Sequence, residues 1–502
     1  MARILVVVPW ARYTPHFETD LELIQRHVHS GDDVHVAVCD GDLPACDRNP
    51  AHEPVRCEMC MGRRRQGLAL VDGNFVSLPL LMLRDTDQAE LRAMTTRFST
   101  LEELRSVAVE GFDLGMAVLS SLISFRREPA PSVVANAAWI ENLLLAALAV
   151  YRSIGNRLRA QRYDRVYVFN GRFAIARAVL RACQAAGVVC ATHERGHDHR
   201  HFALFENALC HDAALMHRTM LECWQRADEA EREAVGAQFF EDRAKGVGKN
   251  WFSFVDKQAN GLLPEDFDPT QKNLVVFVSS EDEFAAIGRE WDDGIYATQV
   301  EGVRHIVDDL VLEDRIHVTL RVHPNLSGID NDQTRAIAQL DSPMLTIVPA
   351  QSAVSSYALL AAANQVLTFG STMGIEAVYW GVPSILAGPS FYRALGATYT
   401  PSTHGELMAL IRSDLEANPR LAALIYGYHW NTFGEPFRYY AAHGVFAGTF
   451  QGSRVRPGLA ALMRAGLLSG LRPFGLVRAR AVRRSRTALL GSRAYGATEV
   501  PE

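Results

Sequence analysis

Short apolar runs alternate with segments of helical periodicity along most of the chain. Residues 4–8 form a continuous apolar run, residues 21–29 carry apolar positions at helical spacing, and residues 34–38 form a second apolar run after a Gly-Asp-Asp turn. A continuous apolar run of this length is typical of a strand that is buried on both faces of a parallel sheet. The pattern predicts a β-α-β unit at the start of the chain.

The same alternation continues to about residue 260. Residues 88–160 contain long apolar-periodic stretches with few helix breakers, which predicts a helix-rich insertion. A strand at 165–169, a helix ending at residue 186 and a strand at 188–192 are predicted next. Strands and helices that alternate in this way predict a doubly wound α/β domain over residues 1–260.

A polar segment at 256–272, which contains two prolines, is predicted to be a linker. The alternation then restarts, which predicts a second α/β domain over 273–450 and a tail at 454–502. The predicted strands are 274–278, 317–322, 345–348, 365–369 and 384–387, and the predicted helices are 299–310, 355–363 and 373–380. Ligands of such sheets bind at the carboxyl ends of the strands. The expected fold therefore has two Rossmann-like, doubly wound domains that face a cleft.

Length and composition agree with two or three globular domains. The 502 residues are 48% hydrophobic and 22% charged, which excludes the disordered and fibrous classes. The apolar start is short and no small-residue cleavage site follows it, so a signal peptide is not expected. The apolar stretch at 143–151 is shorter than the roughly 20 residues that span a bilayer. We therefore expect a cytoplasmic protein.

The formal net charge of −6 is unevenly distributed along the chain. Ten arginines lie between Arg454 and Arg493, and no acidic residue follows them before Glu499. Leucine, valine and phenylalanine are interleaved with these arginines, as in segments that lie in the headgroup plane of an anionic membrane. We expect such membrane contact, which suits a lipid-linked acceptor. The alternative is that part of the tail folds back on the protein. No nucleic-acid partner is expected.

A Gly-Ser-Thr sequence directly after a predicted strand is the most informative motif. Gly370 allows close approach of the backbone, and the hydroxyls of Ser371 and Thr372 add donors to the free N–H groups of a helix start. Glu376, one turn further, is expected to accept hydrogen bonds from sugar hydroxyls. The alternative is an ordinary helix cap with a solvated Glu376.

The two preceding strands also end in groups that suit an anion. Arg321 and His323 follow the strand at 317–322 and are expected to neutralise a departing phosphate. Ser355 or Ser356 is expected to cap a third helix that faces the phosphate. Three consecutive strand ends with such groups predict a site for the phosphates of a nucleotide.

The order of these motifs resembles the capsule polysaccharide biosynthesis family of GT-B glycosyltransferases, which includes Kdo transferases. The resemblance covers about residues 270–395. It rests on a His-Pro pair after a strand, then Gly-Ser-Thr-x-Gly-x-Glu-Ala, Gly-x-Pro and Phe391-Tyr392. It implies a nucleotide-sugar donor and a growing surface polysaccharide, of capsule or O-antigen type, or a lipid-linked acceptor. By the same resemblance His323, Ser371, Thr372 and Glu376 would bind the nucleotide or its phosphate.

Three other functions remain as alternatives. A polyol-phosphate transferase of teichoic-acid type would have the same fold and a nucleotide-activated glycerol donor. A nucleotide-sugar epimerase would also fit the scaffold, although the separate acceptor cleft and the basic tail count against it. A nucleotide-sugar-binding protein without turnover is the third. For the transferase we expect catalysis that is independent of metal.

Three clusters at strand ends of the first domain are candidates for the acceptor side. Glycosyl transfer needs a base near the acceptor hydroxyl or groups that stabilise the departing phosphate. Glu194 and His16 are the expected bases, and Arg195 and Arg172 are expected to bind anionic groups. The alternatives are a salt bridge for Glu194 and packing or capping for His16. The full candidate set is Arg12, His16, Asn170, Arg172, His193, Glu194 and Arg195.

Four of the eight cysteines lie within 22 residues, in a loop predicted at 39–60. They are Cys39, Cys46, Cys57 and Cys60. The last two have the spacing of half a four-thiolate zinc site, which predicts a structural zinc ion. An iron–sulfur cluster is an alternative, although its usual spacing is absent. Four unrelated thiols are another. Without a secretion signal, disulfides are not expected.

Overall fold

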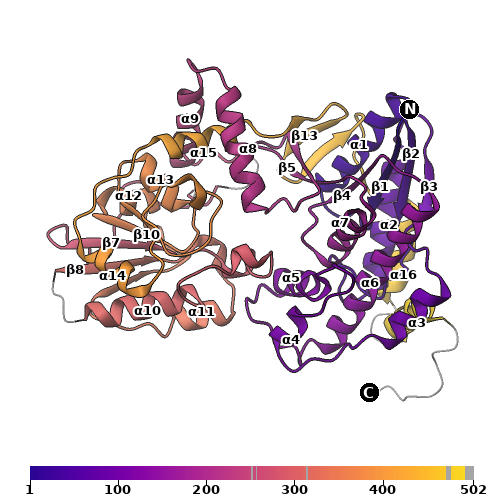
Figure 1. Cartoon of the computed structure of the whole chain (residues 1–502), viewed down its shortest axis with the longest axis horizontal. Helices are drawn as coiled ribbons and strands as arrows, with labels where there is room; N and C mark the ends of the chain where they lie inside the picture. The colour runs from indigo at the N-terminus through magenta and orange to yellow at the C-terminus, as the bar shows by residue number, and fades with distance from the viewer. Residues whose placement is uncertain (250–252, 256, 312–314, 471–475, 492–502) are drawn as a thin grey trace. The chain divides into compact units, whose positions relative to one another are not determined.

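The protein forms two compact units, each of which is built on a mainly parallel sheet with helices on both faces (Figure 1). The computed structural model describes residues 1–249, 253–255, 257–311, 315–470 and 476–491. The first unit comprises residues 1–125, 131–211 and 434–502, and the second comprises residues 126–130 and 212–433. The expected doubly wound α/β architecture is confirmed for both units.

The first unit has a seven-stranded sheet with the order β12-β6-β5-β4-β1-β2-β3. Its strands are β1 (Arg3–Val8), β2 (Asp33–Val38), β3 (Val76–Pro79), β4 (Arg165–Phe169), β5 (Cys190–Arg195), β6 (His201–Glu206) and β12 (Glu435–Pro436). Strand β6 runs antiparallel to both β5 and β12, and the other pairs are parallel. The central strands are apolar because helices cover both faces of the sheet.

Helix α1 (His16–His29) shows how the first unit buries one face of its sheet. Phe17, Leu21 and Ile24 project from it into a cluster with the apolar side chains of β1 and β2. Each side chain of this size contributes roughly 1.5–3 kcal/mol when it is fully buried. The other helices of the unit are α2 (Pro54–Leu68), α3 (Asp85–Ala93), α4 (Leu101–Arg105), α5 (Leu114–Arg126), α6 (Ala137–Ala160) and α7 (Ala174–Ala186).

Helix α6 is long and apolar enough to cross a membrane by length and composition alone, the one such helix among the residues that the structure describes. Within its most apolar window, 72% of the residues are buried inside the protein. It packs against α7. A helix that is apolar on nearly all sides is expected in the interior of a large domain.

The second unit has a five-stranded, fully parallel sheet with the order β11-β10-β7-β8-β9. Helices α10 and α14 bury one face, and α12 and α13 bury the other. The strands are β7 (Lys272–Phe277), β8 (Ile316–Arg321), β9 (Leu345–Val348), β10 (Gln365–Thr368) and β11 (Ser384–Leu386). The helices are α8 (Ala213–Arg226), α9 (Arg232–Ala244), α10 (Gln299–Leu310), α11 (Asp332–Ile337), α12 (Ser356–Ala362), α13 (Met373–Tyr379), α14 (His404–Arg412) and α15 (Leu421–Thr432).

The unit boundaries correct the predicted domain boundaries. Helices α8 and α9, predicted as the end of the first domain, belong to the second unit because both pack against α15. Residues 434–450 belong to the first unit, since β12 pairs with β6 and the hairpin of β13 (Tyr440–Gly444) and β14 (Ala447–Phe450) packs on α1. The segment 257–272 therefore lies inside the second unit, and residue 256 of the predicted linker lies outside the described residues.

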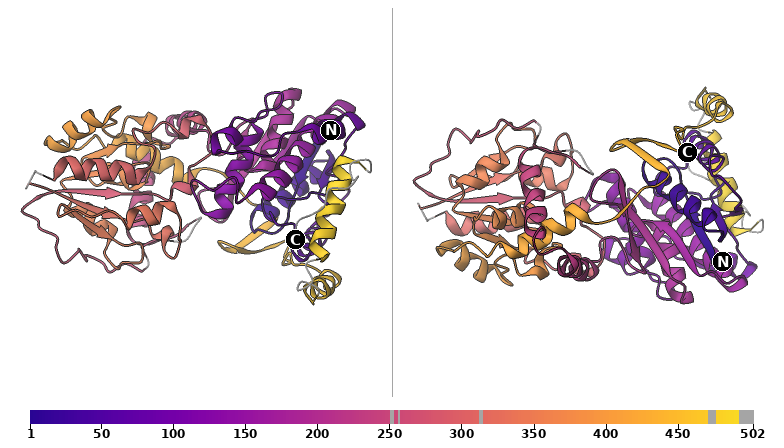
Figure 2. Two further views of the ribbon diagram at one scale, coloured as in Figure 1. Left: turned by 90° about the horizontal axis from the view of Figure 1, so that it is seen from below. Right: turned by 90° about the horizontal axis from the view of Figure 1, so that it is seen from above.

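The basic tail forms two helices, α16 (Leu459–Gly470) and α17 (Leu476–Leu490), which lie against the first unit (Figure 2). Buried Ala461 of α16 packs on Gly62 of α2, where a Cβ atom on the glycine would clash with the alanine Cβ. The Ser485 hydroxyl donates a hydrogen bond to the Gly41 carbonyl. The tail thus folds back, as in the alternative given above; its residues 471–475 and 492–502 lie outside the described part of the chain.

Candidate functional site

The carboxyl edge of the second sheet brings the predicted phosphate-binding loops together. Strands β11, β10, β7, β8 and β9 are successive neighbours, and all run in the same direction. The loops that follow them therefore share one edge, which is where open α/β sheets bind ligands. This edge carries the Gly-Ser-Thr turn after β10 and the His-Pro pair after β8.

The Gly-Ser-Thr turn adopts the predicted strand-to-helix geometry. Gly370 has a φ angle of +136°, and a Cβ atom there would lie 2.6 Å from the carbonyl oxygen of Pro389. Only glycine fits this position without strain. The Tyr392 hydroxyl donates to the Ser371 carbonyl at 2.7 Å, which fixes the turn. Helix α13 has only seven residues, so hydroxyl and guanidinium groups would have to supplement its N-terminus in binding an anion.

Glu376 lies beneath this turn and is fully buried. Its carboxylate accepts hydrogen bonds from Tyr357 Oη at 2.5 Å, from Arg243 Nε at 3.1 Å and from Thr372 Oγ1 at 3.1 Å. Arg243 Nη2 also donates to Thr372 Oγ1 at 3.1 Å. Glu376 was expected to accept hydrogen bonds from sugar hydroxyls, or alternatively to be solvated. Its carboxylate is instead enclosed by protein donors and holds Arg243 beside the turn.

His323 stands at the end of β8 as expected. Its Nδ1 accepts a hydrogen bond from the Asn325 backbone N–H at 3.1 Å, so the remaining proton of the neutral ring is on Nε2. Burial, together with the nearby charges of Arg243 and Arg321, lowers the pKa of His323 to about 4. The ring is consequently neutral at pH 7. It can donate a hydrogen bond to a phosphate oxygen but cannot neutralise its charge.

Arg321 and the two serines stabilise the loop after β9. Arg321 is 2% exposed and donates from Nη1 to the Pro349 carbonyl at 2.5 Å and from Nη2 to the Ser352 carbonyl at 3.4 Å. Burial lowers its pKa to about 10, so it remains charged at pH 7. Ser355 caps α12 by accepting from the Ala358 N–H at 3.1 Å. The structure thus confirms the cap, whereas Arg321 points into the protein.

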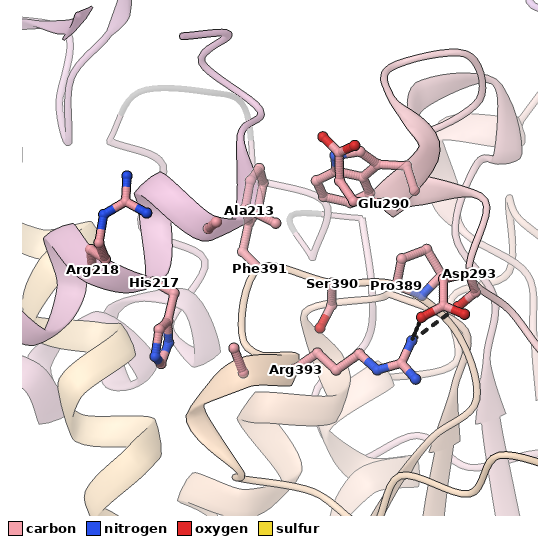
Figure 3. A pocket seen from close by; sticks show the side chains of 12 residues that line it. Ala213, His217, Arg218, Glu290, Asp293, Pro389, Ser390, Phe391 and Arg393 are labelled. Carbon is pink, nitrogen blue, oxygen red and sulfur yellow. Dashed lines mark hydrogen bonds and ion pairs between the residues drawn. The ribbon is translucent and has the colours of Figure 1, made fainter.

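A cavity of about 550 Å³ is lined in part by the loop that follows β11, residues 389–394 (Figure 3). The loop that contains Pro389 both contacts Gly370 and forms one wall. Trp291 and Phe391 lie 4.9 Å apart, edge to face, and Arg393 pairs with Asp293 at 3.2 Å. The lining residues are Ala213, Ala214, His217, Arg218, Glu290, Trp291, Asp293, Pro389, Ser390, Phe391, Arg393 and Ala394. Apolar walls with a few charged groups are typical of sites for small organic ligands.

In the first unit the carboxyl ends of β1, β4 and β5 are neighbours and bring most of the acceptor-side candidates together. Glu194 accepts from Asn170 Nδ2 at 2.7 Å, and its other oxygen lies 3.6 Å from His16 Nδ1. The His16 ring packs 4.1 Å from the Phe169 ring. Burial lowers the pKa of His16 well below its usual value, and Arg195 lowers it further, so the ring is neutral. The side chain of Glu194 is 26% exposed.

The remaining candidates of this cluster differ in accessibility. His193 is fully buried, and its Nε2 lies 2.8 Å from Asp20 Oδ1. Arg172 is 5% exposed and donates to Ser120 Oγ at 2.7 Å. Arg195 donates to the carbonyls of residues 14 and 445. Arg12 is exposed to solvent. Glu194 therefore has the best position to meet an acceptor, while His193 and Arg172 are enclosed by protein.

The four clustered cysteines do not all lie in a loop. Cys57 and Cys60 are on α2, and Cys39 and Cys46 are in the irregular segment that follows β2. A metal ion would need three or more ligand atoms close together. Among the described residues, the group of this size whose ligand atoms all lie within 4.8 Å of one another is instead His197, Asp198 and His201. Asp198 already pairs with Arg200 at 2.9 Å and with His201 at 2.5 Å. The side chains of this turn therefore satisfy one another without a metal ion.

Sequence reasoning missed three residues at the edge of the second sheet. Arg243 comes from α9, which was predicted in the first domain, and no local signal marks it. Tyr357 directly follows the two serines that were singled out, so its position could have been noted. Glu281 begins an acidic run after β7; burial raises its pKa to about 7, and the Gln299 backbone N–H, at 2.7 Å from its carboxylate, opposes that rise.

No protein-family model and no curated protein sequence matches the chain. Solved structures that it resembles include KpsC, a β-Kdo 2,4-transferase of Thermosulfurimonas dismutans, with 13% identity over 61% of this chain and 87% of that chain and a TM-score of 0.36. The calicheamicin glycosyltransferase CalG4 has 14% identity over 86% and 94%, with a TM-score of 0.27. Staphylococcus aureus MnaA in complex with UDP has 12% identity over 87% and 94%, with a TM-score of 0.25.

Proposed function

We propose that this protein is a glycosyltransferase that moves a sugar from a nucleotide-activated donor to a growing surface polysaccharide or a lipid-linked acceptor. The observation that carries the proposal is the arrangement at the carboxyl edge of the second sheet. There the Gly370 turn after β10, the guanidinium of Arg243 from α9 and the ring of His323 after β8 lie along one edge, and the loop that contacts Gly370 also forms a wall of an aromatic-lined cavity. Anion-binding groups next to an apolar pocket suit a nucleoside monophosphate or diphosphate, whose phosphates and base would occupy the two parts of the site.

The donor would bind to the second unit. Its phosphate would accept hydrogen bonds from the turn and from His323 Nε2–H, and Arg243 would supply the positive charge. The base would enter the cavity that Trp291 and Phe391 help to line, where an aromatic ring allows stacking. Glu376 would not touch the sugar and would instead hold Arg243 in place.

The first unit would bind the acceptor and supply the base. Glu194 would remove the proton from the acceptor hydroxyl, assisted by the neighbouring neutral His16. The acceptor oxygen would then bond to the anomeric carbon, while the bond from that carbon to the phosphate oxygen breaks. The phosphate would leave with the electron pair of that bond, and its new charge would be stabilised by Arg243 and the N–H donors. This step needs no metal.

The tail supports contact with an anionic membrane surface, where a lipid-linked acceptor would lie. Its helix α16 turns buried Ala461 and Ala465 toward the protein and leaves a leucine-rich face exposed. The exposed fractions are 71% for Leu459, 47% for Leu462, 57% for Met463 and 73% for Leu467. Arg454 and Arg456, just before the helix, and Arg464 within it are exposed. An apolar stripe with flanking cations suits the interface of an anionic bilayer.

A donor screen with the full-length protein tests the proposed function. Thermal shift against CMP-, UDP-, GDP-, dTDP- and CDP-linked sugars should select one nucleotide, and that donor should then label an acceptor extract with its sugar. Replacement of Arg393, which lines the cavity, by Ala should weaken the response. Transfer of a polyol phosphate or interconversion of the donor would assign the alternative activities instead. Binding without turnover, or no binding, would contradict the proposal.

A further inference from the structure

Arg48 lies at the carboxyl edge of the first sheet, in the irregular segment that follows β2. Its guanidinium carbon is 4.8 Å from the ring centre of Trp10, 4.5 Å from that of Tyr13 and 5.5 Å from that of Phe173. Trp10 and Tyr13 follow β1, Phe173 follows β4, and β4, β1 and β2 are successive neighbours in the sheet. Three loops that are distant in the sequence therefore meet at this guanidinium.

The aromatic rings hold the charge of Arg48 but do not neutralise it. Among the described residues this half-buried side chain forms no ion pair, and its Nε is buried without a hydrogen-bond partner. The carboxylate of the neighbouring Asp47 is held inside the protein, where it accepts from Ser121 Oγ at 2.7 Å and from the Ile175 N–H at 3.4 Å. Arginines that are withdrawn from water are usually paired with an acid. An anionic ligand would supply the acid that the protein does not.

The three arginines that the sequence marked at this edge are less suited to bind an anion. Arg195 donates to two main-chain carbonyls, at 2.9 and 3.2 Å. Arg172 is buried and donates to Ser120 Oγ at 2.7 Å. Arg12 is exposed to water, which screens its charge. The anion-binding role expected of Arg172 and Arg195 therefore passes to Arg48, which no feature of the sequence had marked.

The base proposed for the transfer lies along the same edge. The Phe169 ring contacts both Trp10, at 5.0 Å between ring centres, and His16, at 4.1 Å. His16 Nδ1 in turn lies 3.6 Å from the carboxylate of Glu194. Burial is the main cause of the lowered pKa of His16, and the charge of Arg48 contributes to it. An anion at Arg48 and a hydroxyl at Glu194 can therefore belong to one acceptor molecule.

We propose that Arg48 binds an oxyanion of the acceptor and thereby selects an acidic acceptor for the transfer. The inference rests on the proposed function, because it describes the acceptor of that reaction. The oxyanion would be the carboxylate of an acidic sugar or the phosphate that joins a sugar to a lipid, since a guanidinium binds either through paired N–H donors. The surrounding rings fix the guanidinium and exclude water from it, which strengthens the ion pair. Tyr13 is 42% exposed, so this side of the site is open to solvent.

Calorimetric unfolding of the full-length protein tests the site with glucuronate, glucose 1-phosphate and glucose at one ionic strength. At least one of the two anions should raise the unfolding temperature of the first unit, and glucose should not. The anion with the larger effect identifies a carboxylate or a phosphate as the group that is bound. Arg48→Met keeps an apolar side chain without the charge and should lose the response, whereas Arg65→Met, at an exposed arginine of α2, should keep it. A response to neither anion, an equal response to glucose, or an unchanged response in Arg48→Met would overturn the proposal.

A transfer assay with the wild-type protein covers a variant that does not fold. With the donor found in the screen, the protein should label the part of an acceptor extract that an anion-exchange resin retains, and not the neutral part. If Arg48→Met folds, its KM for the retained acceptor should rise about 10- to 100-fold, with KM for the donor unchanged. Labelling of the neutral part alone would overturn the selection of an acid and leave the proposed function standing. Failure of every donor would remove the proposed function, whereas the calorimetric response to anions does not depend on turnover.

Discussion

At the scale of single residues, the charge at the edge of the second sheet comes from Arg243 rather than from His323. His323 is neutral because burial lowers its pKa to about 4. Burial would lower the pKa of Arg243 as well, but the Glu376 carboxylate beside it raises that pKa above its usual value. A guanidinium held by a buried carboxylate keeps both its charge and its direction, which a phosphate site requires.

We predict that Glu376→Gln weakens donor binding without unfolding the protein. The amide retains the shape of the carboxylate but loses the charge that holds Arg243, which should cost about 1.5–3 kcal/mol of donor binding. Titration calorimetry with the donor found in the screen measures the change. Glu241→Gln is a matched control, because Glu241 contacts Tyr379 and Lys245 on the surface of α9. Equal donor affinities of the two variants would contradict the role of Glu376.

Gly370→Ala should destabilise the second unit and reduce donor binding. Its φ of +136° and the Pro389 carbonyl 2.6 Å from the added Cβ both oppose alanine, so the cost should exceed about 1 kcal/mol. Urea denaturation measures it. Gly405→Ala, in α14, meets no atom within 4 Å and should be neutral or slightly stabilising. A Gly370 variant as stable as the wild type would show that the turn tolerates a side chain.

The stability of the second unit should fall as the pH is lowered from about 6.5 toward 4. Burial lowers the pKa of both His323 and His429 to about 4 in the folded protein, whereas the unfolded chain protonates them near 6.5. Between these values the unfolded state binds more protons, so acid favours unfolding. Denaturation at a series of pH values measures the slope. His323→Asn should reduce it, and His443→Asn, at an exposed histidine of the first unit, should not.

At the scale of elements, helix α16 explains how one segment can serve two surfaces. Small residues, Ala461 and Ala465, allow its close approach to α2 at Gly62, while the leucines project away from the protein. Arg464 of α16 pairs with Glu58 of α2 at 3.0 Å, which fixes the rotation of α16 about its own axis. A helix that needed only a structural contact would gain nothing from a second apolar face exposed to water.

We predict that full-length protein sediments with vesicles of anionic phospholipid and that Leu462→Ser combined with Leu467→Ser prevents it. The substitutions remove apolar surface that is already exposed, so the fold should be unaffected. High salt should weaken wild-type binding, because the arginines contribute about 1 kcal/mol each at low ionic strength. Leu421→Ser, at a 53% exposed leucine of α15, is the matched control. Equal recovery of wild type and double variant in the supernatant would remove the membrane role.

At the scale of the whole molecule, the chain leaves each unit and returns to it. The first unit is completed by the last segment of the chain, which adds an edge strand, a hairpin and two helices to it. Leu489 of α17 is fully buried, and Leu490 accepts a hydrogen bond from Arg92 at its carbonyl. The tail therefore contributes to the stability of the first unit, and it is also a candidate for contact with a membrane.

A chain that ends at Ser453 should consequently be less stable in its first unit. Losing buried groups such as Ala461 and Leu489 exposes the surface of α2 and α3 and should lower the unfolding midpoint of that unit. Donor binding to the second unit should survive. Calorimetric unfolding with and without donor separates the two units. If the shortened chain unfolds as the full-length protein does, the tail helices do not stabilise the first unit, and truncation would become a clean test of membrane contact.

The sequence by itself determined the alternation of strands and helices and the positions of the loops at strand ends. Segments such as 165–169 and 299–310 were predicted with the bounds that the structure has, because a buried strand and an amphipathic helix each impose their own period on the residues. The Gly370 turn was predictable for the same kind of reason. Glycine shortly after a strand permits a positive φ, and the hydroxyl residues that follow it favour the start of a helix, which together indicate a tight turn.

Only the tertiary structure decided which distant groups meet. Arg243 and Glu376 are 133 residues apart, and nothing in the local pattern around Arg243 marks it as a partner. The same holds for the return of α16 and α17 to the first unit and for the assignment of α8 and α9 to the second. Local periodicity reports which face of an element is buried. It carries no information about the element that buries it, because any apolar surface of matching shape satisfies the same hydrophobic requirement.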